Sequence, residues 1–120
     1  ALHFAVLEKN LEKINITKEG FKIRSDIYFS PKGTNVNFFS IINENTLHVK
    51  TYEKGVEKYM LSCGSGSVAS AYYASTFADL KNNLDVIVPG GKLIINYKNN
   101  WKDVLISGKA QLVFKSVISI

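Results

Sequence analysis

The order of hydrophobic and polar residues along the chain predicts a series of strands and two helices. The apolar run from Phe4 to Leu7 is typical of a buried strand. A helix is expected from about Thr17, a residue suited to the N-cap position, to Arg24. Ile16, Gly20 and Ile23 have the spacing of one helix face, and we expect this face to point inward.

The other strand candidates are separated by turn signals. Val36 to Ile42 and Leu47 to Glu53 are expected to form a hairpin around residues 43–45, whereas residues 56–62 fit no clear pattern. Four more strands are expected at Leu84–Val88, Lys92–Tyr97, Asp103–Ile106 and Gln111–Ile118. The turn signals nearest to these runs are Pro31-Lys32-Gly33, Pro89-Gly90-Gly91 and Ser107-Gly108.

The stretch from Gly64 to Ala78 contains no charged residue and is rich in small residues. A helix of this composition belongs inside a protein, and it is too short for a bilayer span, which needs about 20 apolar residues. Strands joined by tight turns must be antiparallel. We therefore predict one α+β domain over residues 1–120, in which a curled, mostly antiparallel sheet wraps around a central buried helix.

Composition narrows the classes of function. The 120 residues are enough for one hydrophobic core, and 46% hydrophobic residues exclude wholesale disorder. The net charge of +5 comes from scattered lysines and arginines, which favours a solvated basic surface over a nucleic-acid-binding stripe. One cysteine excludes an internal disulfide, and with two distant histidines it predicts no metal site. No signal peptide is recognised, and a reduced, cytoplasmic setting is expected. The start without Met suggests that an upstream part is missing.

The single cysteine, Cys63, comes directly before the expected buried helix. The first N–H groups of a helix lack internal partners and carry partial positive charge, so a thiolate there is stabilised and its pKa falls. Gly64, Ser65 and Gly66 would let the backbone approach a carboxylate or a phosphate. Two alternatives remain open from local chemistry: a cysteine packed as a small hydrophobe, and a merely flexible Gly-Ser-Gly turn.

Four blocks of the sequence resemble the active-site blocks of diaminopimelate epimerases. They lie in the expected order and cover nearly the whole chain: His3-Phe4-Ala5-Val6, Pro31-Lys32-Gly33-Thr34-Asn35-Val36-Asn37-Phe38, Thr51-Tyr52-Glu53-Lys54-Gly55 followed by Leu61-Ser62-Cys63-Gly64-Ser65-Gly66, and Val88-Pro89-Gly90-Gly91-Lys92-Leu93. The resemblance implies two similar α+β domains with the active site between them. Each domain would supply one cysteine, and the two would invert one α-carbon of LL-diaminopimelate to the meso form without pyridoxal phosphate, metal or other cofactor. The product would feed lysine and peptidoglycan synthesis.

The resemblance also assigns roles to residues. Cys63 would be one acid/base, and the amides of Gly64 and Ser65 would hold the substrate α-carboxylate. Glu53, expected within reach of Cys63, would accept hydrogen bonds from the α-ammonium, and Asn35 would contact the distal end. Lys54 replaces the usual arginine, and it keeps the charge but loses bidentate geometry. The alternatives to these substrate-binding roles are that Asn35 is only a turn residue and that Glu53 is only an exposed surface charge.

No second cysteine is present in these 120 residues, so the chain resembles the C-terminal half of such an enzyme. Its expected partners are a small amino-acid substrate and the missing N-terminal domain, with no nucleic acid and no membrane. By itself the half is expected to be inactive and to expose an apolar face that favours self-association, for example as a homodimer. Two other interpretations stay open: another isomerase or racemase of the same fold, and a non-catalytic domain that binds a small acid.

Overall fold

The computed structural model describes residues 3–30, 33–53, 58–60, 64–108 and 111–116. The elements, in chain order, are β1 (His3–Leu7), η1 (Leu11–Lys13), α1 (Ile16–Arg24), η2 (Ile27–Phe29), β2 (Asn35–Asn43), β3 (Thr46–Glu53), β4 (Lys58–Met60), α2 (Gly64–Ser75), β5 (Asn83–Val88), β6 (Gly91–Lys98), β7 (Asp103–Gly108) and β8 (Gln111–Ser116). Each expected strand is found. The three-residue strand β4 was not predicted, because a run this short has no period to read.

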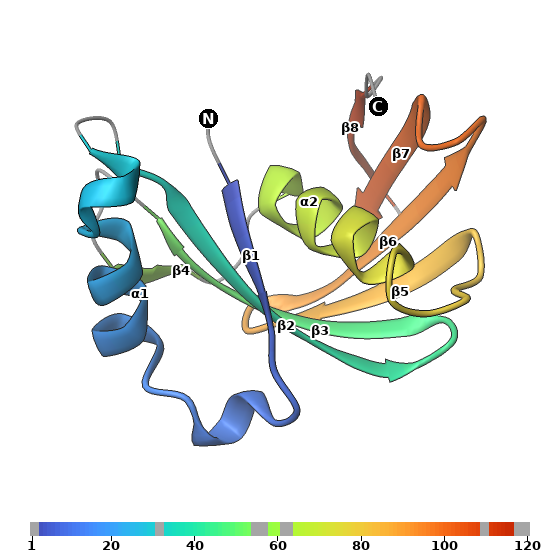
Figure 1. The fold of residues 1–120 in the computed structure, drawn as a ribbon. Helices are drawn as coiled ribbons and strands as arrows, with labels where there is room; N and C mark the ends of the chain where they lie inside the picture. The colour runs from blue at the N-terminus through green and yellow to red at the C-terminus, as the bar shows by residue number, and fades with distance from the viewer. Residues whose placement is uncertain (1–2, 31–32, 54–57, 61–63, 109–110, 117–120) are drawn as a thin grey trace.

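One curved sheet contains all the described strands, in the order β1-β2-β3-β5-β6-β7-β8, with β4 beside the end of β3. The pairs β2–β3, β3–β4, β5–β6, β6–β7 and β7–β8 are antiparallel, whereas β1 with β2 and β3 with β5 are parallel. The sheet curls around α2 without closing, since β1 and β8 lie at its two edges (Figure 1). The predicted α+β class, with a mostly antiparallel sheet around a central helix, is therefore confirmed.

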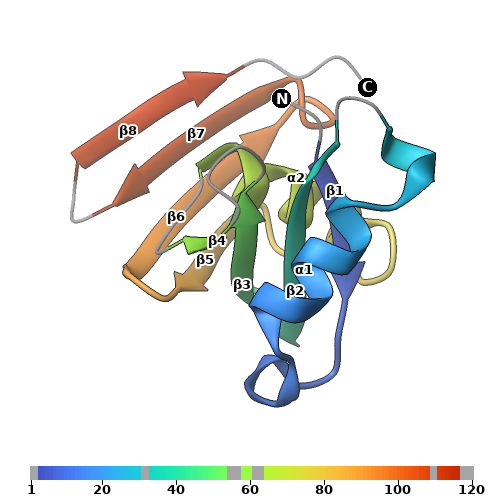
Figure 2. The ribbon, with the colours of Figure 1, turned by 90° about the vertical axis from the view of Figure 1, so that its left-hand side faces the viewer.

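Parallel strands need a long crossover connection, which usually contains a helix. Here α1 lies in the connection between β1 and β2, and α2 lies in the connection between β3 and β5. α1 lies between β1 and β2 in the sequence and packs on one face of β2 and β3, and α2 lies on the other face (Figures 1 and 2). Two apolar clusters result. The larger one packs α2 against the curved sheet, and the smaller one packs α1 against Val36, Phe38 and Tyr52.

α2 is buried as predicted. Val68 is 6% exposed and Ala71 is fully buried, and the small residues along the helix allow close contact with the sheet. The helix ends at Ser75, three residues before the predicted end at Ala78. The hydroxyls of Ser75 and Thr76 donate to the carbonyls of Tyr72 and Tyr73, which satisfies acceptors of the last turn and ends the helix. No helix in the described ranges is both long and apolar enough to cross a membrane.

α1 starts earlier than the sequence suggested. Its N-cap is Asn15, whose side-chain oxygen accepts a hydrogen bond from the Lys18 amide at 3.1 Å, and Thr17 lies inside the helix. Asparagine is the better capping residue of the two, which explains the difference. Ile16 and Gly20 are buried, and Ile23 packs against the same cluster, so the predicted inner face is confirmed.

Gly20 is the point of closest approach between α1 and the sheet. A Cβ atom built there would lie 2.5 Å from both Cβ and Cγ of Tyr52. These are the innermost atoms of a side chain that is 1% exposed, so they cannot swing aside.

We expect Gly20→Ala to destabilise the fold by about 1–3 kcal/mol, because overpacking outweighs the gain of about 1 kcal/mol in helix propensity. Urea unfolding followed by the fluorescence of Trp101, the single tryptophan, measures the change. Lys18→Ala, on the exposed side of the same helix, is the matched control and should leave the free energy of unfolding within about 0.5 kcal/mol. An equal or higher stability for Gly20→Ala would contradict the packing argument.

One predicted turn is displaced, and another is only partly described. Ser107 and Gly108 belong to β7 and pair with Leu112 and Gln111, so the β7–β8 connection falls at residues 109–110, outside the described residues. Of the turn predicted at 31–33 only Gly33 is described, and its φ of +73° fits the left-handed region that glycine favours.

Candidate active site at the head of the central helix

One end of each of three neighbouring strands lies where α2 begins, namely the starts of β1 and β2 and the end of β3. His3 starts β1 and pairs with Asn35, which starts β2. Val36 pairs with Tyr52 of β3, and Asn35 and Glu53 each lie one residue beyond that pair, toward the same end of the sheet. The first turn of α2 lies at this end as well, beside the start of β1 (Figure 1).

A chain of side-chain hydrogen bonds links the sheet to the head of α2. Thr51 Oγ1 donates to Asn37 Oδ1 at 2.9 Å, and the Asn37 amide nitrogen lies 3.2 Å from His3 Nδ1. His3 Nε2 is 3.0 Å from the Ser65 hydroxyl oxygen. Thr51 and Asn37 are buried, so the inner end of this chain is shielded from water.

The direction of the hydrogen bonds fixes the state of the imidazole. Since Asn37 Oδ1 accepts from Thr51, its NH₂ group faces His3 and can only donate. His3 Nδ1 is therefore the acceptor. The proton of the neutral ring then sits on Nε2, from which it is donated to the Ser65 hydroxyl. This arrangement holds the Ser65 side chain at the helix head.

The first turn of α2 has the properties of an anion site. Gly64 and Ser65 are half-buried and exposed, respectively, and the first turn carries no acidic residue. Helix N-terminal N–H groups and the helix dipole favour a carboxylate or a phosphate at such a position. Cys63 precedes Gly64 in the sequence and lies outside the described residues.

Asn35 is a strand residue. It is 5% exposed at the start of β2, and its carbonyl accepts a hydrogen bond from Thr34 Oγ1 at 2.9 Å. Of the other residues assigned from the resemblance, Lys54 lies outside the described residues, and only the backbone of Glu53 is described. That Glu53 reaches Cys63 stays a prediction.

Sequence reasoning missed the link formed by His3, Asn37 and Thr51. All three residues belong to the blocks quoted above, but none was given a role. The alternation of Asn35 and Asn37, which places two amides on one face of a strand, was the available signal. The contact between His3 and Ser65 spans 62 positions and depends on the parallel pairing of β1 with β2, which local patterns do not reveal.

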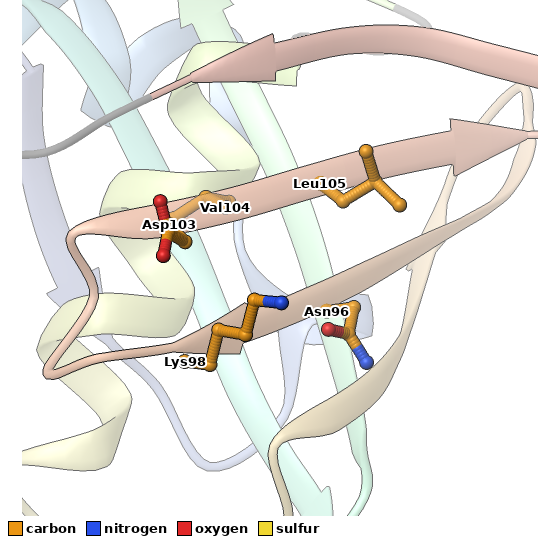
Figure 3. Close-up of a pocket in the computed structure, with 5 residues that line it drawn as sticks. All are labelled: Asn96, Lys98, Asp103, Val104 and Leu105. Atoms are coloured by element: carbon orange, nitrogen blue, oxygen red, sulfur yellow. The ribbon is translucent and has the colours of Figure 1, made fainter.

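Two surface hollows are candidate binding sites for small molecules. A groove of about 390 Å³ runs between β1 and α2, lined by His3, Phe4, Ala5, Ala69, Tyr72 and Tyr73. A second hollow of about 200 Å³ lies on β6 and β7 and is lined by Asn96 and Lys98 of β6 and by Asp103, Val104 and Leu105 of β7 (Figure 3). The groove shares His3 with the hydrogen-bond chain, whereas the second hollow uses strands remote from β1 in the sheet.

The resolved pKa shifts lie away from the strand ends described above. Burial and the neighbouring Lys50 lower the pKa of His48, and burial together with Asp79 raises the pKa of Tyr97. In the part of the chain that is described, no three His, Cys, Asp or Glu side chains come together as a metal site would require.

Comparison with known proteins identifies the family. The family model described as diaminopimelate epimerase matches residues 2–113. The diaminopimelate epimerase of Aquifex aeolicus is 37% identical over 119 residues, and that of Methanocella arvoryzae is 35% identical over 118 residues. Each alignment covers 98% of this chain but only 43% and 41% of the relative, so the chain spans about two fifths of the length of these proteins.

A solved structure shows the same fold in a distant protein. The crystal structure of a phenazine biosynthesis protein PhzF family member from Enterococcus faecalis superposes with a TM-score of 0.61 at 12% identity. The match covers 87% of this chain and 35% of the other. At this identity the likeness concerns the fold, whereas the sequence matches over nearly the whole chain concern the family. The chain belongs to the diaminopimelate epimerase family.

Proposed function

We propose that this chain is the C-terminal half of a diaminopimelate epimerase, which interconverts LL- and meso-diaminopimelate through two cysteines, one of them Cys63. The observation that carries the proposal is the meeting of the α2 head with the starts of β1 and β2, where His3 contacts Ser65 and Asn35 is buried nearby. Residues from three of the family-like blocks converge there. Relatives named diaminopimelate epimerase at up to 37% identity support the choice of substrate.

The proposed reaction needs an acid and a base on opposite faces of one carbon. The Cys63 thiolate removes the α-proton of one stereoisomer, and a thiol from the other half of the protein delivers a proton to the opposite face. The electron pair left by the proton spreads into the α-carboxylate, and the thiol and thiolate have exchanged roles when the product leaves. The helix dipole both lowers the pKa of a thiol at this position and stabilises the carboxylate charge.

His3 acts in this scheme as a positioning residue. Its neutral ring, fixed by Asn37, donates to the Ser65 hydroxyl and keeps the first turn of α2 in place. The amides of Gly64 and Ser65 then hold the substrate α-carboxylate. Glu53 accepts from the α-ammonium and Asn35 contacts the distal end of the substrate, while Lys54 meets the distal carboxylate as a point charge.

The test uses the full-length protein and LL-diaminopimelate in D₂O, with a chelator and without pyridoxal phosphate. We expect meso-diaminopimelate that carries one deuterium at the inverted carbon, because the returning proton comes from a thiol that exchanges with solvent. Lysine, which lacks the distal carboxylate, is the matched control and should not be inverted. Inversion of another amino acid in place of diaminopimelate would favour a different racemase of the same fold. Binding without turnover of any amino acid would favour the non-catalytic interpretation.

A further inference from the structure

A third hollow, of about 300 Å³, lies where α2 ends, at the opposite end of this helix from Gly64 and Ser65. We call it the α2-end hollow. It is formed by the last residue of α2 and the segment that follows, by the end of β6 and by the β6–β7 connection, and its lining includes Ser75, Asp79, Leu80, Tyr97, Asn100 and Trp101. Its volume is at the lower end of the range of small-molecule sites.

The hydroxyl and carboxylate oxygens of the α2-end hollow are hydrogen-bond acceptors. The Tyr97 hydroxyl donates to the Leu80 carbonyl at 3.3 Å, and the Ser75 hydroxyl donates to the Tyr72 carbonyl at 2.6 Å. Since a hydroxyl has one proton, both oxygens can only accept a further hydrogen bond. The exposed Asp79 carboxylate also only accepts when it is ionised. These three oxygens therefore favour a ligand that donates hydrogen bonds.

The charge at this end of α2 favours a cation. The C-terminus of a helix carries partial negative charge, to which the Asp79 carboxylate adds a full one. Burial and Asp79 raise the pKa of Tyr97, so the carboxylate acts on the same hydroxyl. Within the part of the chain that the structure describes, Asp79 forms no ion pair. Lys98 also borders the α2-end hollow, but its side chain extends toward Asn96 over the hollow on β6 and β7 (Figure 3).

Two stacked rings give the α2-end hollow an apolar wall. Tyr97 and Trp101 lie 3.7 Å apart between centroids at an interplanar angle of 10°, and Tyr72 packs edge-on against Trp101. Asn99, Asn100 and Trp101 all have positive φ, which is uncommon for residues other than glycine. Backbone of this kind is concentrated at functional sites. The ligand therefore has an apolar part beside its cationic group.

We infer that the α2-end hollow binds a small molecule that carries a primary ammonium group on a short apolar stem. The three N–H donors of an ammonium group equal in number the acceptor oxygens of Ser75, Asp79 and Tyr97, and the stem contacts the wall formed by Tyr97 and Trp101. The α2-end hollow and the candidate active site lie at opposite ends of α2, so this ligand is not the substrate of the proposed reaction.

Titration of the full-length protein with n-butylammonium chloride tests the site without an activity assay. The protein is labelled with 5-fluorotryptophan, and the fluorine NMR signal of Trp101 is assigned by its absence from the Trp101→Phe spectrum. We expect a saturable shift of this signal in the millimolar range, because a ligand of five non-hydrogen atoms binds weakly. n-Butanol has the stem without the charge, and sodium chloride has the ionic strength without the stem. A saturable shift with either control, or none with n-butylammonium, would overturn the inference.

A variant tests the role of the carboxylate. Asp79→Asn keeps the shape of the side chain and removes its charge, and it should raise the concentration for half-saturation about three- to fivefold, as expected for an exposed ion pair. Asp85→Asn is the matched control, since Asp85 lies on β5 outside the α2-end hollow and already pairs with Lys92 at 3.7 Å. It should leave half-saturation unchanged. No change in Asp79→Asn, or an equal change in both variants, would reject the site.

A second probe tests the role of the three acceptor oxygens. n-Butyltrimethylammonium has the same stem and charge as n-butylammonium but no N–H donor. It should need a clearly higher concentration for half-saturation of the Trp101 shift, because the oxygens of Ser75, Asp79 and Tyr97 would lose their hydrogen bonds. Binding as tight as that of n-butylammonium would overturn recognition of a primary ammonium group.

Discussion

Cys63→Ser in the full-length protein should stop inversion of diaminopimelate almost as completely as Cys63→Ala. A serine hydroxyl has nearly the shape of the thiol but does not ionise near neutral pH, so the helix head has no base to stabilise. Loss of a general acid or base typically costs about 10²–10⁴-fold in rate, and we expect both variants to fall in or beyond this range. The measurement follows the formation of meso-diaminopimelate from the LL form under steady-state conditions.

Measuring exchange of the substrate α-proton with solvent distinguishes a variant that has lost one of its two bases from a variant whose whole site is disrupted. With a competent cysteine remaining on the opposite face, one stereoisomer should still exchange its α-proton with D₂O although inversion has stopped. Thr76→Ala, a hydroxyl removed from the far end of α2, is the control and should leave inversion unchanged. Inversion by Cys63→Ser at a rate near that of the wild type would reject the two-cysteine mechanism and the role given to the helix head.

Local sequence signals identified most of the elements. The hairpin of β2 and β3 and that of β5 and β6 were predictable because polar or glycine-rich turns separate runs of β-forming residues. The uncharged stretch after Cys63 predicted a buried helix, because only a helix surrounded by other elements tolerates apolar residues on most sides. These signals act within a few residues, and each agrees with the final fold.

The contacts that build the site were not predictable in the same way. The parallel pairing of β1 with β2 joins segments about thirty residues apart, and it alone brings His3 beside Asn35 and Asn37. α1 can lie this close to the sheet because Gly20 has no side chain. From the sequence alone, a glycine at this position indicates only a lower helix propensity. The family blocks named Cys63, Asn35 and Glu53, but the link from Thr51 to Ser65 became visible only with the geometry.

Trp101 gives the clearest case of a residue whose local preference is overruled by packing. Asn99, Asn100 and Trp101, in the connection between β6 and β7, have φ values of 56°, 54° and 68°. Asparagine tolerates this left-handed region, whereas for a bulky residue such as tryptophan it is strained. The Trp101 ring is nevertheless 6% exposed and stacks on Tyr97 with a centroid distance of 3.7 Å. The burial of the ring therefore offsets the strain in its own backbone.

Trp101→Ala should lower the free energy of unfolding by about 3–5 kcal/mol, because it removes a buried ring that packs flat on Tyr97 and edge-on against Tyr72 of α2, while the backbone strain remains. Trp101→Phe is the matched control, because it keeps an aromatic ring against Tyr97, and its free energy of unfolding should fall by clearly less than that of Trp101→Ala. Urea unfolding followed by circular dichroism measures both, since the variants lack the only tryptophan. A loss below about 1 kcal/mol for Trp101→Ala would mean that relief of strain at a positive φ matches the packing, since such strain costs about 1–3 kcal/mol. The β6–β7 connection would then be held by the turn asparagines and not by the buried ring.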